Sequence, residues 1–396
     1  MRIAIFSDNF YPELSGISDS IIQLGKELGR LNHQVCFFAP KYSKKNYETV
    51  KQPRLELNLG QNIKIKRFFS LPFPSPTKQA RLVIPGFWRW LSVKNFKPDI
   101  IHSQLFFGVG LEAMAAAKIL KRPLIGTNHT RIKEFFKSGY LNSRRLGEIA
   151  TNYMNWYYNH CDFVTAPARS FLDEMITNGI IAPSRSIPNP VSAEVFNNSG
   201  QTDSEAVRKK YNLSGPVIVY AGRLAYEKNI DVIIRALQLI KKEIPEVNLA
   251  LAGHGQAEDW LKKLALELGL EKNVKFLGTL SPDGLAELYR SADVFTIASI
   301  SEVQSMTIIQ AMACGLPALG VNCNSVPELI GENCGLLFKP GDSKDLSEQL
   351  VKLLSNNDLR RKLGQGAVNS TPKFAAANIA KEWINLYGEV IEKYHK

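Results

Sequence analysis

Short apolar segments alternate with amphipathic ones along almost the whole chain. The first apolar segment, residues 2–7, is followed by isoleucines and leucines at positions 17, 21, 24, 28 and 31. Their spacing of three or four residues places them on one face of a helix. A second apolar segment, 35–39, comes directly after that helix. This strand–helix–strand order predicts a parallel sheet with right-handed crossover connections.

The alternation continues in two series, interrupted by a turn-rich segment. In the first series we expect strands at 63–68, 100–102, 124–127 and 163–166. In the second we expect strands at 217–221, 248–252, 274–277, 294–298, 317–321 and 335–339. The clearest helices of the second series are expected at 230–242, 260–268, 284–291, 306–314 and 345–354, and a last amphipathic helix at 375–394.

The segment between the two series marks a domain boundary. Residues 184–191 read SRSIPNPV, and a polar stretch follows at 199–203. We place the boundary after residue 190. The prediction is an α/β protein of two doubly wound domains that face each other across a cleft, with ligands bound outside the carboxyl ends of the strands.

Composition narrows the class of protein. The 396 residues are 45% hydrophobic and 22% charged, which excludes a collagen-like, disordered or coiled-coil chain. No apolar run approaches the ~18 residues of a membrane-spanning helix, and Asp8 follows too few apolar residues for a signal peptide. We therefore expect a cytoplasmic protein. Five scattered cysteines without a CxxC pair predict reduced, mostly buried thiols.

The net positive charge of the chain lies entirely in its first half. The net charge is +12, and residues 1–190 alone carry +13. Residues 41–97 contain 13 basic and two acidic side chains, interleaved with aromatic ones, a pattern that suits a membrane interface. The alternative is an ordinary core beneath a solvated charged face. The candidates for membrane or acceptor contact are Lys64, Lys66, Arg67, Arg81, Trp88, Arg89 and Trp90, and the same stretch contains Lys78 and Phe87.

Two cations follow the first strand of the second series. The segment GRLAYEKN at 222–229 places Arg223 and Lys228 just beyond the carboxyl end of strand 217–221. Charge-assisted hydrogen bonds from two such side chains can hold a diphosphate. The alternative is a pair of surface ions.

An acid precedes a helix in SEVQSMTIIQAMACGLP, residues 301–317. Glu302 can accept hydrogen bonds from sugar hydroxyls, and the helix that follows offers first-turn amides for a phosphate. Those amides belong to Ser305, Met306 and Thr307, and Gln310 lies two turns further along the helix. The alternative is a capped core helix with a solvated Glu302.

Weaker signals lie at three other strand ends. Gly16 opens the first helix, where amides and the helix dipole favour an anion. Gly253 and Gly255, in AGHG, would let a ligand approach the backbone. His129 follows strand 124–127 and can donate to a phosphate or a sugar hydroxyl, or act as acid or base. Each could instead be an ordinary loop residue.

Some common motifs are missing from the sequence. It contains no D-x-D, so the usual aspartate pair for a nucleotide-bound metal ion is absent, and we expect no metal requirement. It also lacks GxGxxG, GxxxxGK[ST] and GxSxG, which disfavours a dinucleotide fingerprint, a P-loop and a serine-hydrolase elbow.

The motifs together resemble the retaining glycosyltransferases of family 4, which have the GT-B fold. The resemblance extends over nearly the whole chain, from SG at 15–16 and NHT at 128–130 to the segments 222–229, 252–255 and 301–317. In the family's E-x7-E element the first acid is Glu302, but Gln310 replaces the second. The Glu-Val-Gln-Ser loop is similar to that of the diacylglycerol glucosyltransferase branch.

The resemblance implies a role for each candidate residue. Arg223 and Lys228 would neutralise the diphosphate of the donor, and Glu302 would hold hydroxyls of its sugar. Ser305, Met306 and Thr307 would contact phosphate and sugar through their backbones, and Gln310 would contact the ribose. The base would lie near Phe276 and Leu277, and the diphosphate over Gly16. His129 would lie beside the donor sugar and the acceptor. The last helix, 376–396, would cross back to the first domain, so that residues 1–190 and 376–396 bind acceptor and membrane while 191–375 bind the donor.

The leading hypothesis is a hexosyltransferase that moves glucose from UDP-glucose to a lipid such as diacylglycerol. Its co-substrate is a nucleotide sugar without a metal cofactor, and its partners are the lipid acceptor and the anionic inner face of the cell membrane, but no nucleic acid. One alternative keeps the fold with a soluble or phosphoinositol-type acceptor. The other is a non-enzymatic basic adaptor with a decayed donor site.

Overall fold

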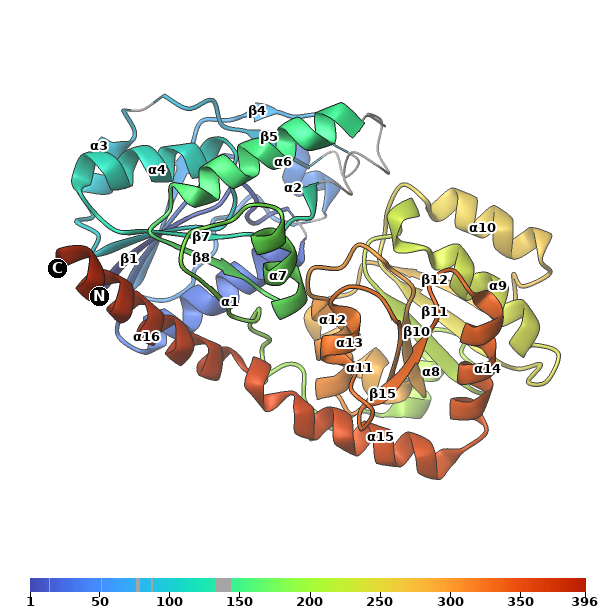
Figure 1. Ribbon diagram of the computed structural model, residues 1–396. Coiled ribbons are helices and arrows are strands. Elements are labelled where there is room, and N and C mark those ends of the chain that lie inside the picture. The colour runs from blue at the N-terminus through green and yellow to red at the C-terminus, as the bar shows by residue number, and fades with distance from the viewer. Residues whose placement is uncertain (14, 51, 76–78, 87, 133–143) are drawn as a thin grey trace. The chain divides into compact units, whose positions relative to one another are not determined.

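A computed structural model describes residues 1–13, 15–50, 52–75, 79–86, 88–132 and 144–396 of the chain. It divides into two compact units, unit 1 with Met1–Pro190 and Ala376–Lys396, and unit 2 with Val191–Ala375. Each unit is built on its own parallel sheet, with helices packed against it (Figure 1). The predicted α/β class with two doubly wound sheets is therefore confirmed.

Unit 1 contains a seven-stranded parallel sheet in the order β3-β2-β1-β6-β7-β8-β9. Its strands are β1 (Arg2–Phe6), β2 (Gln34–Pro40), β3 (Ile63–Phe68), β6 (Ile100–Ser103), β7 (Leu124–Thr127), β8 (Phe163–Ala166) and β9 (Ser184–Ser186). Apart from this sheet, β4 (Leu71–Pro72) and β5 (Arg81–Leu82) form a short antiparallel ladder.

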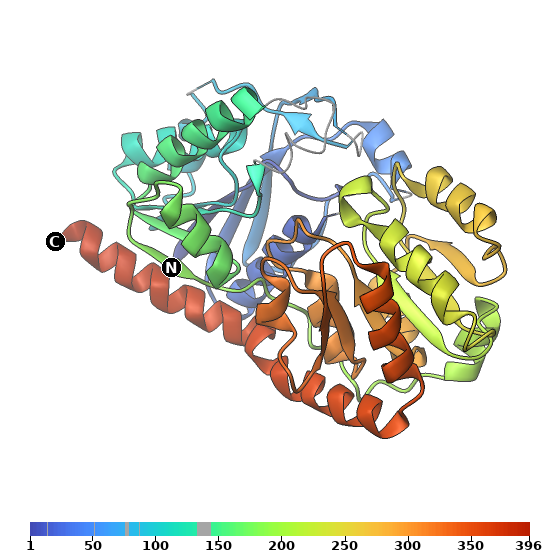
Figure 2. The ribbon, with the colours of Figure 1, turned by 45° about the vertical axis from the view of Figure 1, so that its right-hand side comes forward.

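The helices of unit 1 include the last helix of the chain. They are α1 (Gly16–Arg30), α2 (Lys44–Thr49), α3 (Trp90–Lys94), α4 (Gly108–Leu120), α6 (Arg144–Asn159), α7 (Arg169–Thr177) and α16 (Ala376–His395). Helices α1 and α16 lie side by side and share one core with Ile3 and Ile5 of β1 (Figure 2). The C-terminal helix is thus an integral part of unit 1.

Unit 2 contains a six-stranded parallel sheet in the order β12-β11-β10-β13-β14-β15. Its strands are β10 (Val217–Ala221), β11 (Asn248–Ala252), β12 (Val274–Gly278), β13 (Val294–Ile297), β14 (Ala318–Val321) and β15 (Gly335–Phe338). Every residue of β10 is buried, as expected for a central parallel strand that is covered on both faces.

Helices connect these strands on both faces of the unit 2 sheet. They are α8 (Ser204–Lys210), η1 (Tyr226–Lys228), α9 (Ile230–Ile240), α10 (Glu258–Glu267), α11 (Pro282–Ser291), α12 (Met306–Ala313), α13 (Val326–Leu329), α14 (Ser343–Leu354), α15 (Asn357–Ser370) and η2 (Pro372–Phe374). Helix α9 packs against α10 and α14, whereas α12 packs against α11 and α15.

The sequence pattern did not reveal one strand in the boundary segment. Residues 184–191 are rich in turn formers, but Ser184–Ser186 forms strand β9. This strand is short, polar and at the edge of the sheet, so its own sequence carries no apolar pattern. It forms because its backbone pairs with Val164, Thr165 and Ala166 of β8.

Both sheets reverse their strand order beside their first strand. In unit 2 the chain proceeds from β10 to β11 and β12 on one side, and then to β13, β14 and β15 on the other. The reversal falls between β10 and β13, and the corresponding position in unit 1 lies between β1 and β6. Loops at the carboxyl ends of such strands diverge, which makes these points the preferred ligand positions of the fold.

Candidate functional site

The strand order of unit 2 brings four of the predicted motifs to one edge of its sheet. Strands β12, β11, β10 and β13 are consecutive neighbours, and all of them run in the same direction. Their carboxyl ends therefore carry, side by side, Phe276–Leu277, Gly253–Gly255, Arg223–Lys228 and Ser299–Ser305.

An ion pair joins the two loops that flank the reversal. Lys228 Nζ lies 2.6 Å from Glu302 Oε1, and the two side chains are only 17% and 12% exposed. A lysine ammonium has three donors, so this contact leaves further donors for an anionic ligand. Ser325 Oγ donates to the Glu302 carbonyl oxygen at 3.1 Å, which helps to hold the loop.

The charge environment keeps Glu302 ionised. Burial alone would raise the pKa of this carboxyl, but the charge and hydrogen bond of Lys228, a hydrogen bond from Ser299 and the charge of Arg223 leave the pKa below its ordinary value. Arg223 Nη2 also lies 2.8 Å from Glu227 Oε1, and the Arg223 side chain remains 41% exposed. The three charged residues predicted from the sequence are therefore brought together in one electrostatic cluster.

Helix α12 begins directly after the Glu302 loop. Ser305 is its N-cap, and the Ser305 side chain accepts a hydrogen bond from Ile308 N at 3.4 Å. In the described part of the chain, the backbone amides of Met306 and Thr307 donate to no protein acceptor. They are available to an anion at the positive end of the helix dipole. Gln310 is half-buried further along the same helix.

The two glycines of the AGHG segment have a packing reason for being glycine in addition to the one expected. A Cβ atom on Gly253 would lie 1.9 Å from the carbonyl oxygen of Gly222, and one on Gly255 would lie 2.3 Å from that of Leu224. Leu224 N donates to His254 O at 3.1 Å. The missing side chains allow this loop to pack against the Arg223 loop, and approach of a ligand to these glycines stays a prediction.

Phe276 and Leu277 are half-buried at the end of β12. Lys262 Nζ lies 5.4 Å from the centre of the Phe276 ring. The neighbouring Gly278 accepts a hydrogen bond from Gly253 N at 2.8 Å, which ties this strand end to the AGHG loop. Contact of the two residues with a nucleotide base stays a prediction.

In unit 1 the half-buried His129 follows β7, as predicted. His129 Nε2 lies 2.7 Å from Gln104 Oε1. Because a carbonyl oxygen can only accept, Nε2 carries the proton, and Nδ1 presents a lone pair. Burial lowers the pKa of this histidine to about 4, so its ring is neutral at pH 7.

Sequence reasoning missed the residues that hold His129. Gln104 follows β6, the neighbour of β7, and its Nε2 lies 3.1 Å from Nε2 of the buried His102. His102 is held in turn by the Tyr387 hydroxyl at 2.7 Å and the Thr127 hydroxyl at 2.6 Å. A network therefore extends from α16 to His129. The sequence does contain a signal for this contact. His102 and Gln104 lie at the end of β6, and β6 is the neighbour of β7, the strand that precedes His129.

Gly16 lies at the first position of α1, as predicted, and is exposed. Ser15 caps this helix by accepting a hydrogen bond from Ser18 N at 3.1 Å. The preceding strand ends before Asp8, a second residue that sequence reasoning missed. Asp8 accepts the Val109 amide at 2.7 Å and so caps α4, while burial raises the pKa of its carboxyl to about 6.

Two family models match successive parts of the chain. The model described as glycosyltransferase family 4 matches residues 14–195, and the model described as glycosyl transferases group 1 matches residues 203–370. The chain belongs to glycosyltransferase family 4. The predicted resemblance and the interpretation as a hexosyltransferase are thereby confirmed.

Two relatives of this glycosyltransferase are alpha-monoglucosyldiacylglycerol synthases. The one from Streptococcus pneumoniae is 29% identical over 81% of this chain and 70% of its own. The one from Acholeplasma laidlawii is 27% identical over 100% of this chain and 99% of its own. Among solved structures, the HepE protein of Anabaena in complex with UDP-glucose matches with a TM-score of 0.76 at 19% identity, over 98% of this chain and 100% of that one. This likeness shows that the glycosyltransferase has the GT-B fold.

Most of the basic side chains predicted to face a membrane have partners inside unit 1. Arg67 forms two hydrogen bonds with Glu56, at 2.8 and 2.7 Å, and its side chain is 13% exposed. Arg89 Nη1 lies 2.9 Å from Oε1 of the buried Glu112, and the Arg89 side chain is 12% exposed. Arg81 donates to Ser70 Oγ at 3.0 Å. Arg67 and Arg89 are therefore largely covered and paired with acids inside unit 1, and Ser70 engages Arg81; contact of these arginines with a membrane stays a prediction.

The other residues of the basic stretch differ in exposure. Lys64 is exposed, whereas Lys66 is half-buried and donates to Ser92 O at 2.8 Å. Trp88 is 65% exposed, and the half-buried Trp90 has Lys94 Nζ 5.9 Å from its ring centre. Lys78 and Phe87 lie outside the described residues.

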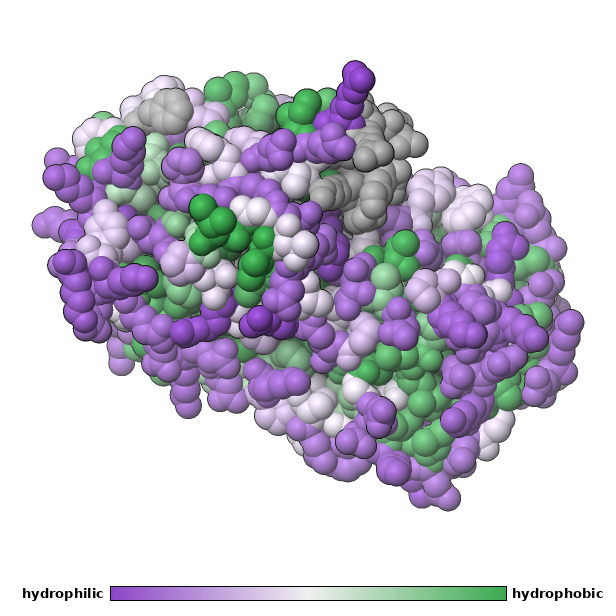
Figure 3. Space-filling model, in the orientation of Figure 1, coloured by the Kyte–Doolittle hydropathy of each residue, from purple (hydrophilic) through white to green (hydrophobic). Residues whose placement is uncertain are grey.

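Apolar side chains of the same stretch are exposed. Phe69 is 70% exposed and Phe73 49% exposed, beside the β4–β5 ladder. The others, apart from Trp88, are Leu55, Leu71, Leu82, Ile84 and Leu91. Figure 3 shows hydrophobic surface along the border of unit 1 where Figure 1 places β4. Within the described ranges, none of the helices has both the length and the apolar content needed to cross a membrane.

Proposed function

We propose that this glycosyltransferase transfers a glucosyl residue from UDP-glucose to diacylglycerol, with retention of the anomeric configuration, at the anionic inner face of the cell membrane. The observation that carries the proposal is the cluster of Arg223, Lys228 and Glu302 at the strand reversal of unit 2. Unit 2 would bind the donor, and unit 1 the acceptor and the membrane.

The cluster suits a nucleotide diphosphate sugar. Arg223 and Lys228 would neutralise the diphosphate, and the free amides of Met306 and Thr307 would add donors at the α12 terminus. Glu302 stays ionised and can accept hydrogen bonds from sugar hydroxyls. The Gln310 side chain can still bond a ribose hydroxyl through its amide, although it lacks the charge of the family's second acid.

The reaction would take place on one face of the sugar. The acceptor hydroxyl oxygen forms a bond to the anomeric carbon while the bond from that carbon to the diphosphate oxygen breaks. The acceptor proton passes to the departing phosphate, so no protein carboxylate acts as nucleophile. Catalysis would rest on positioning and on stabilising the charge that develops on the leaving diphosphate. His129, neutral and with its Nδ1 lone pair available, would contact the donor sugar or the acceptor.

The choice of substrates is supported by different observations. Both named bacterial relatives are alpha-monoglucosyldiacylglycerol synthases, which favours glucose and diacylglycerol. The uridine nucleotide follows from the family resemblance of the motifs. Exposed Phe69, Phe73 and Trp88 on unit 1 suit a protein that reaches its acceptor at a lipid surface.

The test is a product assay with purified protein. UDP-glucose, UDP-galactose and GDP-mannose, each labelled in the sugar, are offered with vesicles that contain diacylglycerol, with inositol phosphate, or alone. We expect a labelled glycolipid with UDP-glucose and vesicles, with an α linkage by NMR, and its loss in Lys228→Ala. Transfer to inositol phosphate alone would replace the lipid acceptor with a soluble one. Donor binding without transfer or hydrolysis would contradict the enzymatic proposal.

A further inference from the structure

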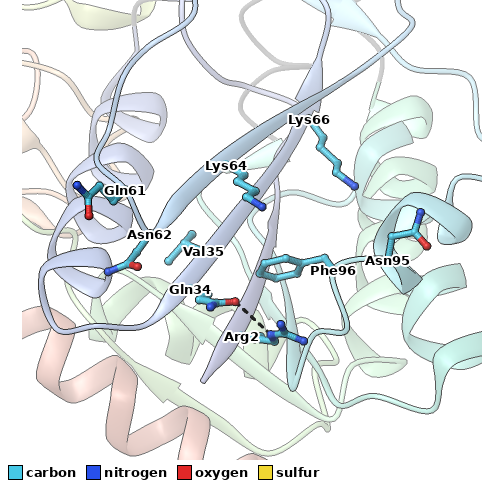
Figure 4. A pocket seen from close by; sticks show the side chains of 9 residues that line it. All are labelled: Arg2, Gln34, Val35, Gln61, Asn62, Lys64, Lys66, Asn95 and Phe96. Carbon is cyan, nitrogen blue, oxygen red and sulfur yellow. Dashed lines mark hydrogen bonds between the residues drawn. The ribbon is translucent and has the colours of Figure 1, made fainter.

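A separate polar hollow lies in unit 1, at the amino ends of its strands rather than at the carboxyl ends where His129 and Gly16 lie. Its volume is about 270 Å³ (Figure 4). Arg2 and Gln34 are the first residues of β1 and β2, and Lys64 is the second residue of β3. The hollow is therefore built at the amino ends of three adjacent parallel strands. His129 and Gly16 follow the carboxyl ends of strands in the same unit, so this hollow is distinct from the site described above.

The alternation of β3 explains why cations point into this hollow. The strand reads IKIKRF, and side chains alternate between the faces of a sheet. Ile63 and Ile65 pack against the core beneath α1 and α16. Lys64 and Lys66 consequently project from the other face, and Figure 4 shows both side chains directed into the hollow.

Three cationic side chains line the hollow without a carboxylate. They are Arg2, Lys64 and Lys66, and the other lining residues are amides, one valine and Phe96. Among the described residues none of the three cations forms an ion pair with an acid. Asp99 accepts the Arg2 backbone amide at 2.7 Å but does not line the hollow. The positive charge is therefore locally uncompensated.

Neutral contacts hold two of these cations in place. Arg2 Nε donates to Gln34 Oε1 at 3.1 Å, and Lys66 Nζ donates to Ser92 O at 2.8 Å. These bonds orient the side chains but leave their charges in place. Arg67 on the same strand shows the contrast, because Glu56 neutralises it. Oriented cations with further free donors are the usual partners of phosphate.

We propose that this hollow binds the phosphate group of a small phosphate ester. The three cations and the amide side chains would contact the phosphate oxygens, and the Phe96 ring would cover a short organic group. The volume lies just below the about 300–1,000 Å³ of pockets for drug-sized ligands, which argues for a compact ligand. A dissolved phosphate ester and the head group of a phospholipid present the same chemistry, and the proposal is independent of the sugar acceptor.

The test compares two double variants of equal charge. Lys64→Gln with Lys66→Gln alters the hollow, whereas Lys45→Gln with Lys118→Gln removes two exposed cations elsewhere in unit 1. Binding of sn-glycerol 3-phosphate is measured by titration calorimetry, and binding to phosphatidylglycerol vesicles by sedimentation. Both are repeated in an Arg223→Ala background, which weakens binding at the unit 2 cluster. Circular dichroism confirms folding, and Lys64→Arg with Lys66→Arg provides a charge-preserving variant.

We expect saturable binding that the hollow pair weakens by about tenfold or more, since each lost charge-assisted hydrogen bond typically contributes a factor of that size. The control pair and the charge-preserving pair should bind like the wild type. Selective loss with glycerol phosphate identifies a dissolved ester as ligand, and selective loss only with vesicles identifies a head group. Absence of binding to both probes, or equal weakening by both glutamine pairs, would overturn the proposal.

Discussion

Lys228 and Glu302 are 74 residues apart in the sequence and 2.6 Å apart in the structure. They meet because β10 and β13 are neighbours at the strand reversal of unit 2. Each side chain alone is an ordinary loop residue. Together with Arg223 they form the charged cluster on which the proposed donor chemistry depends, and this cluster can be tested residue by residue.

Removing either cation should slow the reaction strongly. Arg223→Ala and Lys228→Ala each remove positive charge that would face the departing diphosphate, and the loss of such stabilisation costs ~10²–10³-fold in kcat. Steady-state rates with UDP-glucose and diacylglycerol vesicles test this. Lys242→Ala, which changes an exposed lysine of the same unit, is the matched control. Wild-type rates in both cation variants would remove the cluster from the mechanism.

Gln104 should determine the protonation of His129. In Gln104→Glu a carboxylate replaces the amide oxygen 2.7 Å from His129 Nε2. An adjacent negative charge favours the imidazolium, so the pKa of His129 should rise from about 4 by roughly one to three pH units. The neutral ring would then be lost at a higher pH than in the wild type, and the acidic limb of the rate profile should move upward.

The measurement that isolates this effect is a ¹⁵N NMR titration of the His129 ring alongside the pH–rate profile. Gln104→Leu serves as control, because it removes the acceptor without adding charge. It should lower kcat while leaving the ring pKa low. An unchanged ring pKa in Gln104→Glu would show that the contact does not control the histidine.

At the scale of elements, α16 is the clearest case of a helix that belongs to a core distant in sequence. Its buried face contributes Ile379, Trp383, Leu386 and Tyr387 to the core of unit 1. Trp383 lies over His102, with ring centres 4.4 Å apart, and Tyr387 bonds the same histidine. The helix therefore completes the core and also supports the network that holds His129.

Trp383→Ala should destabilise unit 1. A buried tryptophan replaced by alanine leaves a cavity that costs about 3–5 kcal/mol. Urea unfolding, followed by the fluorescence of the remaining tryptophans of unit 1, measures the loss in the free energy of unfolding. The control is Glu382→Ala on the exposed face of the same helix, which should change the free energy of unfolding by less than ~0.5 kcal/mol. Equal effects of the two changes would mean that α16 contributes little to the core.

At the scale of the whole molecule, the proposed chemistry uses two cations where many nucleotide-sugar enzymes use a metal ion. The sequence contains no D-x-D, and within the described ranges no three His, Cys, Asp or Glu residues group as a metal site would require. We expect glucosyl transfer to persist in excess EDTA, because Arg223 and Lys228 would supply the positive charge. Complete loss of activity that Mg²⁺ restores would contradict this mechanism.

Membrane association should depend on the exposed apolar residues of unit 1. Phe69→Ser, Phe73→Ser and Trp88→Ser together remove large side chains that can enter the lipid interface. The triple variant should sediment less with anionic vesicles, and wild-type binding should weaken with salt. Leu266→Ser, an exposed apolar residue of unit 2, is the control. Binding of the triple variant equal to that of the wild type would remove this surface from the proposed membrane contact.

The membrane contact predicted here rests on exposed apolar side chains, whereas the charge pattern of the sequence alone points to basic ones. The candidates for membrane contact that the sequence indicates are Lys64, Lys66, Arg67, Arg81, Trp88, Arg89 and Trp90. Arg89 is instead paired with the buried Glu112, and removing one partner of such a pair typically costs about 3–5 kcal/mol. A variant that changes Arg89 would therefore report on folding rather than on lipid binding.

The sequence by itself predicted the elements of unit 2 and the charged residues of its cluster. Buried parallel strands are short apolar runs, so β10, β11 and their neighbours are evident from local pattern. Arg223, Lys228 and Glu302 stand out because they follow predicted strand ends in segments that resemble the motifs of a known family. By contrast, β9 has no apolar pattern of its own and exists only through its pairing with β8.

Only the tertiary structure decided which polar groups are partners. Side-chain pairing depends on strand order and register, which link residues far apart in the chain. It joined His129 to Gln104, His102 and Tyr387, and it assigned Arg67 and Arg89 to internal acids. It also explained Gly253 by its packing against Gly222. A composition counts charges, but whether a charge is neutralised or left uncompensated, as in the hollow beside Lys64, is a property of three-dimensional packing.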